Sequence, residues 1–146
     1  MSNLPSNRKS ANERSIEELQ MDTLQWDKLL QISTEEIHFL EQYLSADIFQ
    51  SEIPNIYESL GRFSEELEDI KIEKMELHSA LRNHKNDLNG MRECEDISCD
   101  IFYHSQHQNI SNSIRAHLSK FQELKLRIYR FSSPTLKKKS HYEDMS

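Results

Sequence analysis

The chain has 146 residues, an apolar content of 36%, a formal charge of -7 and a mean hydropathy of -0.80. This composition excludes a thick globular core but is adequate for one thin helical domain. No stretch approaches the roughly 18 apolar residues of a membrane span, and the first residues lack the apolar core of a secretion signal. We therefore expect a cytoplasmic protein without a membrane span.

Apolar residues recur at steps of three, four or seven along three stretches of the chain, as in Leu30, Ile37, Leu40 and Leu44 of the first and Leu60, Leu67, Ile70 and Leu77 of the second. A mean spacing of about 3.5 residues places such side chains along one seam of a helix. The pattern predicts an all-α fold, an elongated antiparallel three-helix bundle (up-down-up) with coiled-coil-like packing. The helices are expected at about 15–49, 55–89 and 94–131.

The first predicted helix follows a polar stretch, residues 1–14, that we expect to be a disordered lead. Ser15 and Glu18 form a Ser-x-x-Glu capping box, which marks the helix start. A second such box, Ser33 to Glu36, lies inside the helix and leaves a break near Ile32 as an alternative. Because the apolar seam passes through it without a change of phase, we favour one continuous helix.

Proline and glycine mark the other helix boundaries. Pro54 lies in the first connection, 50–55, and Gly90 is expected to stop the second helix with a positive φ. The third helix is expected to end at Ser132, Ser133 and Pro134. The bundle would thus occupy 15–132, followed by a flexible polar tail at 133–146.

Charge is distributed unevenly along the chain. Residues 16–100 have a net charge of -14, whereas residues 115–139 have a net charge of +7. We expect the basic half of the third helix to pack beside the acidic stretch at 65–69. The alternative is an anion-binding surface, although the negative overall charge argues against nucleic acid as the main partner.

Cys94 and Cys99 are the only cysteines. A separation of five on a continuous helix places them on different faces, so we expect both thiols to be reduced. If residues 92–96 form a turn, Cys94 could instead reach Cys99.

A divalent metal site is conceivable at the start of the third helix. Asp96, Asp100, His104 and His107 follow one another at steps of four, four and three and would share a helix face. Asp100, His104 and His107 are the candidate ligands. Bundles that hold metals usually draw ligands from several helices, and the second helix offers no matching Glu-x-x-His.

Histidines also interrupt the apolar seams, at His84, His107 and His117. With the second turn centred near residues 92–93, Trp26, His78 and His107 come to one level and would form a polar core layer. Such a layer can fix the register of a bundle. It can alternatively respond to pH or bind a small ligand.

No catalytic motif is present. With two glycines the chain contains neither a phosphate-binding loop nor a Gly-x-Ser-x-Gly, and no set of residues fills the roles of nucleophile, base and charge stabiliser. We therefore expect a protein that is not an enzyme and needs no cofactor.

The expected function is that of a helical scaffold or adaptor that binds either another protein or its own copy, the latter giving a homodimer. Leu29, Phe39, Tyr43 and Met75 lie off the main seams and are the candidate binding anchors. The alternative function is a metal- or small-ligand-binding bundle that uses the His/Asp cluster near the second hairpin. The sequence leaves the partner and the oligomeric state open.

Overall fold

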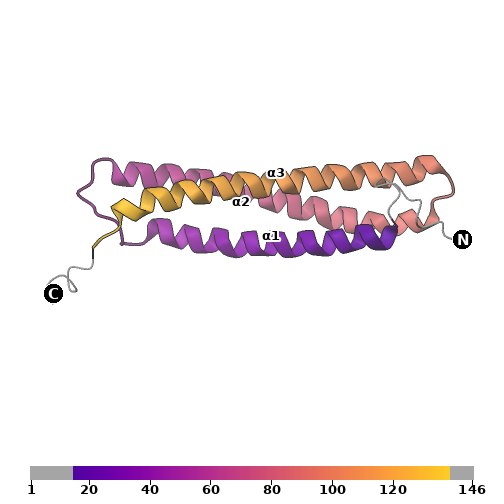
Figure 1. The fold of residues 1–146 in the computed structure, drawn as a ribbon, viewed down its shortest axis with the longest axis horizontal. Coiled ribbons are helices and arrows are strands. Elements are labelled where there is room, and N and C mark those ends of the chain that lie inside the picture. Colours follow the sequence, from indigo (N-terminus) through magenta and orange to yellow (C-terminus); the bar gives the residue numbers. More distant parts are fainter. Residues whose placement is uncertain (1–14, 139–146) are drawn as a thin grey trace, which may run out of the picture.

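The computed structural model describes residues 15–138, which fold into three α-helices and one short 3-10 helix. They are α1 (Ile16–Ser45), α2 (Ile56–Leu88), η3 (Asn89–Glu93) and α3 (Ile97–Thr135). Figure 1 shows the long helices side by side along one axis, which confirms the all-helical bundle. The expected disordered lead, and residues 139–146 of the expected tail, lie outside the described residues. Within the described part, no helix is long and apolar enough to cross a bilayer.

The first helix begins as predicted and ends early. The Ser15 hydroxyl accepts from the Glu18 amide at 3.2 Å, and the Glu18 carboxylate accepts from the Ser15 amide at 2.8 Å. The helix continues through Ile32 without a break. It ends at Ser45, four residues before the predicted end, because Ala46 is extended. The chain that follows is therefore free to turn inward.

This turn carries Phe49 into the core, where it forms an isolated bridge with Leu136. The Gln50 amide donates to the Thr135 carbonyl at 2.8 Å, and the Lys137 amide donates to the Ile48 carbonyl, also at 2.8 Å. The first connection and the C-terminal end of α3 with the residues after it thus close this end of the bundle together. Phe49 was predicted to lie inside the first helix.

The third helix extends beyond its predicted end and includes Pro134 in its last turn. Pro134 has no amide hydrogen to donate to the Arg130 carbonyl, and its ring crowds that carbonyl, so other contacts must stabilise this turn. The hydroxyls of Ser132 and Thr135 donate to the carbonyls of Ile128 and Phe131 at 2.7 and 2.8 Å. The predicted stop at Ser132–Pro134 was therefore wrong.

The second connection also differs from the prediction. Gly90 has no positive φ and lies inside η3, while Asn55 before α2 is the non-glycine residue with a left-handed backbone, at φ 61°. The space that a Cβ on Gly90 would need is taken by the Tyr103 hydroxyl, 2.7 Å away. Asp96 caps α3 by accepting from the Cys99 amide at 2.9 Å, so α3 starts three residues later than expected. This moves the centre of the hairpin from 92–93 to about 95–96.

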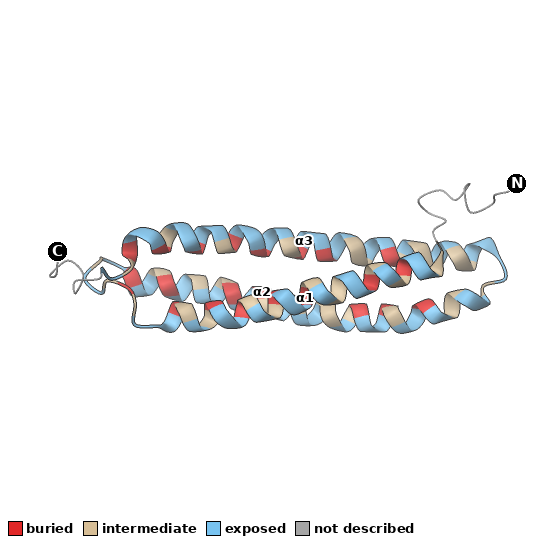
Figure 2. Ribbon diagram, turned by 60° about the horizontal axis from the view of Figure 1, so that its bottom comes forward, coloured by how far each residue is buried: buried red, intermediate tan, exposed pale blue. Residues whose placement is uncertain are grey.

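The core changes character along the bundle. Figure 2 shows buried residues along the inward faces of all three helices. A continuous apolar cluster fills the end near the first connection: Ile37, Leu40, Leu44, Phe49, Ile56, Leu60, Leu67, Ile70, Phe121, Leu124 and Ile128. The remainder includes buried polar residues among its apolar ones: Thr23, Ser33, His84, His107 and His117. All three seam histidines are therefore interior.

Candidate binding groove and buried histidine pair

The basic half of α3 is largely neutralised by acids of α1 and α2. Arg127 binds Glu66 at 3.0 Å, and Lys120 binds Glu73 at 2.8 Å. The hydrogen bond from Arg127 lowers the pKa of Glu66. Lys125 joins α3 to Glu36 of α1, and Lys137, just after α3, pairs with Asp47 of the first connection. These contacts agree with the expected packing of basic against acidic helix faces, and they leave Arg115 and Arg130 as the bases of α3 that pair with no acid in the range 15–138.

A groove between α1 and α2 has the opposite character. It consists of two adjoining hollows, of about 510 Å³ and 230 Å³. The larger is lined by Leu24, Asp27, Lys28, Gln31, His78, Arg82 and Lys85. The smaller is lined by Thr34, Glu35, Ile37, His38, Glu41, Lys71 and Lys74. We call these fourteen residues the α1/α2 groove.

The groove concentrates the positive charge of an acidic region. Residues 16–100 contain 21 acids and 7 bases, and five of those bases line the groove. Lys71 is paired with Glu41 at 3.0 Å, and Lys85 is paired with Asp27. The other three bases, Lys28, Lys74 and Arg82, form no ion pair with any acid in the range 15–138.

The hollows between α2 and α3 provide a contrast. One is lined by three acids and two bases, and its bases are both paired: Glu66, Asp69, Ile70, Lys120, Glu123, Leu124 and Arg127. Another is lined by acids and small or apolar residues: Glu73, Glu76, Leu77, Ala80, Ser113 and Ala116. Within the described chain, these two hollows between α2 and α3 are therefore lined by no unpaired base, in contrast to the α1/α2 groove.

The basic residues of the groove have a signal in the sequence that the sequence analysis missed. Five residues of α2 follow one another at steps of three, four, four and three: Lys71, Lys74, His78, Arg82 and Lys85. This spacing puts them on one helix face. The net charge of the whole segment hid the stripe, because acids on the other faces outnumber it.

The four predicted anchors do not share one surface. Phe39 and Met75 are exposed, and each is next in sequence to a residue that lines the groove. Tyr43 is half-buried and packs against the apolar core cluster. Leu29 lies seven residues after Asp22 and seven before Glu36, and both of these acids contact α3. It therefore lies on the side of α1 that faces α3. Only Phe39 and Met75 flank the groove.

The second candidate site is a buried histidine pair. The Nε2 atom of His84 lies 2.8 Å from the Nδ1 atom of His107. The Nδ1 atom of His84 lies 3.2 Å from the Gln106 side-chain oxygen, and the Nε2 atom of His107 lies 2.9 Å from Asp22. The Trp26 ring covers His107, with centroids 4.6 Å apart. The network joins all three long helices.

The predicted polar layer of Trp26, His78 and His107 is therefore corrected in one member. Trp26 and His107 come together as expected, but His84 occupies the place assigned to His78. His78 instead lies 3.8 Å from Asp27 at the groove. The reason is the late start of α3, which brings His107 level with a residue nearly two turns further along α2.

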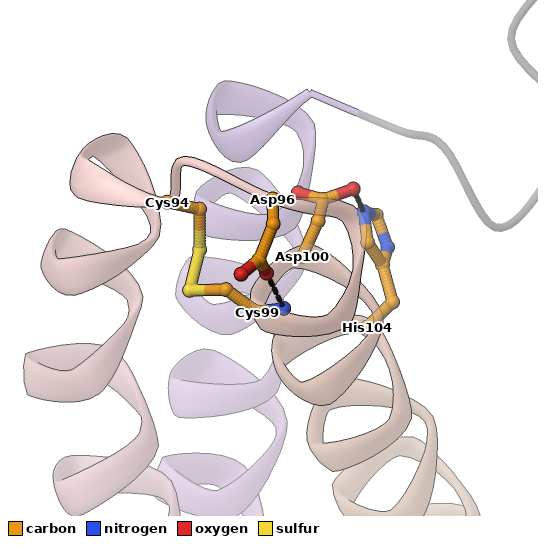
Figure 3. Close-up of a disulfide and its surroundings, with 5 residues drawn as sticks. All are labelled: Cys94, Asp96, Cys99, Asp100 and His104. Carbon is orange, nitrogen blue, oxygen red and sulfur yellow. Dashed lines mark hydrogen bonds and ion pairs between the residues drawn. A yellow bond between two sulfur atoms is a disulfide. The ribbon is translucent and has the colours of Figure 1, made fainter.

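The candidate metal ligands do not converge. Asp100 and His104 lie 3.6 Å apart near the second hairpin (Figure 3), whereas His107 points to Asp22 and His84. Over residues 15–138, no group of three or more His, Cys, Asp or Glu side chains could hold a metal ion. The structure thus gives no support to the metal-binding alternative.

The cysteines form a disulfide, contrary to the expectation of two reduced thiols. Cys94 follows η3 in an extended conformation, and Cys99 lies in the first turn of α3 (Figure 3). Because the chain turns between them, their Cα atoms are 5.5 Å apart, within the usual range for a disulfide. The turn that the sequence left as an alternative is the one that forms.

We expect reduction of this disulfide to lower the free energy of unfolding by about 2 kcal/mol, the loop-entropy value for so short a loop. Denaturant unfolding with and without dithiothreitol measures the effect. The double variant Cys94→Ser/Cys99→Ser is the control, because its unfolding should not respond to the reductant. Identical curves for the natural chain under both conditions, or two free thiols in the intact mass without reductant, would contradict the expectation.

Both candidate sites consist of side chains that the packed helices position. The groove presents unpaired cations at a concave surface, and the histidine pair is enclosed by the helices. No known protein family, curated protein or solved structure matches this chain.

Proposed function

We propose that this protein is a non-enzymatic helical adaptor whose α1/α2 groove binds an acidic amphipathic helix of another protein. One observation carries the proposal: five of the seven bases within residues 16–100 line this groove. Three of the five have no acidic partner among residues 15–138. A groove between two helices is a common receptor for a third, amphipathic helix.

The net negative charge of the chain does not oppose this choice of partner. At physiological ionic strength the Debye length is about 8 Å, so distant exposed acids are screened while the nearest cations act. Lys28 of α1 and Arg82 of α2 both line the larger hollow and are both exposed. Carboxylates of a docked helix could pair with them without displacing an existing ion pair.

Apolar residues at the groove supply the second part of the recognition. Leu24 lines the larger hollow and is 58% exposed, and Met75 beside the smaller one is 57% exposed. Phe39 is exposed as well and stacks on Tyr43, with ring centroids 6.0 Å apart. Burial of apolar area at about 25 cal/mol per Å² would supply affinity, while the charges would select the partner.

The test uses a fluorescein-labelled helical peptide with leucines on one face and glutamates beside them, and measures its binding by fluorescence polarisation. We expect the full chain to bind this peptide and not its glutamate-to-lysine counterpart, and added salt should weaken the binding. The double variant Lys28→Glu/Arg82→Glu should bind about tenfold more weakly, as expected for two reversed charges at a partly screened site.

The control is Arg115→Glu/Arg130→Glu, which makes the same charge change at exposed positions of α3 outside the groove. This variant should bind as the natural chain does. Equal losses in both variants would mean that net charge alone governs binding, and no loss in the groove variant would refute the site. Sedimentation of the protein alone addresses self-association: a dimer disrupted by the groove variant would make a second copy the occupant instead.

We also infer an antiparallel, up-down-up order with coiled-coil-like packing for this adaptor. Contacts between Asp27 and Lys85, and between Glu41 and Lys71, support opposite directions for α1 and α2. Contacts between His84 and His107, and between Glu66 and Arg127, support the same for α2 and α3. The apolar seam near 3.5 residues supports the packing.

The cytoplasm was the location expected from the sequence, and it stays a prediction. The disulfide between Cys94 and Cys99 favours an oxidising compartment instead, because cytosolic thiols are normally kept reduced. Alkylation of the protein inside its own cells, followed by mass measurement, would show which state is present.

A further inference from the structure

Asp22 and Gln106, the outer partners of the buried histidine pair, determine which ring nitrogens donate to them. A carboxylate only accepts, so the Nε2 atom of His107 donates to Asp22. The Gln106 amide nitrogen faces Asp87 at 3.5 Å, so the Gln106 oxygen faces His84 and accepts from its Nδ1 atom. Each ring thus holds one hydrogen at its outer nitrogen, and one further hydrogen lies between Nε2 of His84 and Nδ1 of His107. We assign this hydrogen to His107, because its Nε2 atom contacts the Asp22 carboxylate, whereas burial lowers the pKa of His84.

This chain of donors requires a single positive charge on the two rings. His107 carries hydrogens on both nitrogens and is an imidazolium, while His84 is neutral with its hydrogen on Nδ1. Asp22 is half-buried and balances the charge. His84 is 1% exposed and His107 is 5% exposed, so water cannot readily replace Gln106 and Asp22 as their hydrogen-bond partners.

We propose that the His84–His107 pair is a pH-sensitive switch of this bundle: with one shared positive charge it joins α1, α2 and α3, and uptake of a second proton separates the rings. A second proton can enter only at Nε2 of His84. There it would point at the hydrogen on His107 Nδ1 across 2.8 Å, and two positive rings would share one buried site.

The surrounding charges determine the pH range. The charged groups at the pair include Asp22 from α1 and Asp87 from α2, while α3 contributes the uncharged Gln106. Burial lowers the pKa of His84 below its ordinary value of 6.5, and the contacts with Gln106 and Asp87 oppose this only in part.

The sign of the effect on stability follows. Below pH 6.5 the unfolded chain takes up a proton at residue 84 that the folded chain does not, so the unfolded state binds more protons. The contribution of neutral His84 to the free energy of unfolding is complete above pH 6.5. It is lost as the pH falls toward the lower pKa that His84 has in the folded protein. The folding equilibrium constant should decrease by up to about tenfold per pH unit in this range.

The first test measures the protonation of both rings in the natural, full-length chain by two-dimensional 15N–1H NMR of histidine side chains at neutral pH. We expect a His107 ring with two protonated nitrogens and a His84 ring protonated at Nδ1 only. A neutral His107, or a His84 protonated at Nε2, would overturn the proposal even if no variant folds.

The second test measures denaturant unfolding between about pH 5 and 6.5, above the range in which most carboxylates titrate. His84→Gln should lose most of the pH dependence that the natural chain shows there. His78→Gln removes a histidine of α2 outside the pair and should keep that dependence. A flat profile for the natural chain, or equal profiles for the natural chain and His84→Gln, would refute the switch. Neither result bears on the peptide assay of the α1/α2 groove.

Discussion

Phe49→Ala should lower the free energy of unfolding by about 3–5 kcal/mol, the usual cost of removing a buried phenylalanine side chain. The Phe49 side chain is 2% exposed and lies between two other rings, with centroids 5.7 Å from Tyr43 and 6.3 Å from Phe131. The backbone of Phe49 pairs with Leu136, which places this side chain where the first connection meets the C-terminal end of α3. Removing the ring would therefore open a cavity at that point. Chemical denaturation followed by circular dichroism measures the change.

Phe39→Ala is the matched control, because it removes the same atoms from a side chain that is 61% exposed. We expect a cost below about 1 kcal/mol for it, as for most surface substitutions. If both variants lost equal stability, Phe49 would not be a core residue, and the closure of this end by residues 46–50 and 135–137 would be wrong.

Leu67→Ala is expected to cost about 2–5 kcal/mol, because the cavity adds to the lost transfer free energy. Leu67 is 1% exposed and belongs to the apolar cluster that all three long helices share. At about 3–4 °C per kcal/mol for a chain of this size, the midpoint of thermal unfolding should fall by roughly 6–20 °C.

Leu24→Ala provides the comparison for Leu67, since Leu24 is 58% exposed. Its cost should stay near the 0.5 kcal/mol typical of surface positions, or about a tenth of the largest core values. Leu77, which lies on the same predicted seam as Leu67, is only half-buried and should lose an intermediate amount when truncated. A Leu67 variant as stable as the natural chain would mean that the seam is not the core.

The helices themselves were largely predictable because their signals are local. The Ser15–Glu18 capping box fixed the start of α1, and the seam spacing identified the buried faces of Leu30, Ile37 and Leu67. The ends were less predictable. Phe49 satisfies the helical spacing equally well inside a helix or beyond it, and only its contact with Leu136 decides between the two.

The candidate sites required more than the seams. The basic stripe on α2 could be read from the sequence spacing of its lysines and arginine. The groove beside it exists only because α1 packs against α2, so that Lys28 and Arg82 line one hollow. The histidine pair depended on the length of the second connection. A shift of three residues in the start of α3 moved the centre of the hairpin by three residues, and so moved the residue of α2 level with His107 by six, from His78 to His84. Both histidines can face the interior because helix side chains return to the same face every three to four residues.

By itself, the sequence determined that this protein consists of three long amphipathic helices with polar residues in an otherwise apolar seam. Those features depend on spacing within each helix, which the chain carries locally. The tertiary structure decided which histidines meet, that Cys94 reaches Cys99, and where unpaired cations gather. These outcomes depend on the register between helices, which is set by the exact length of each connection and by contacts between residues far apart in the chain.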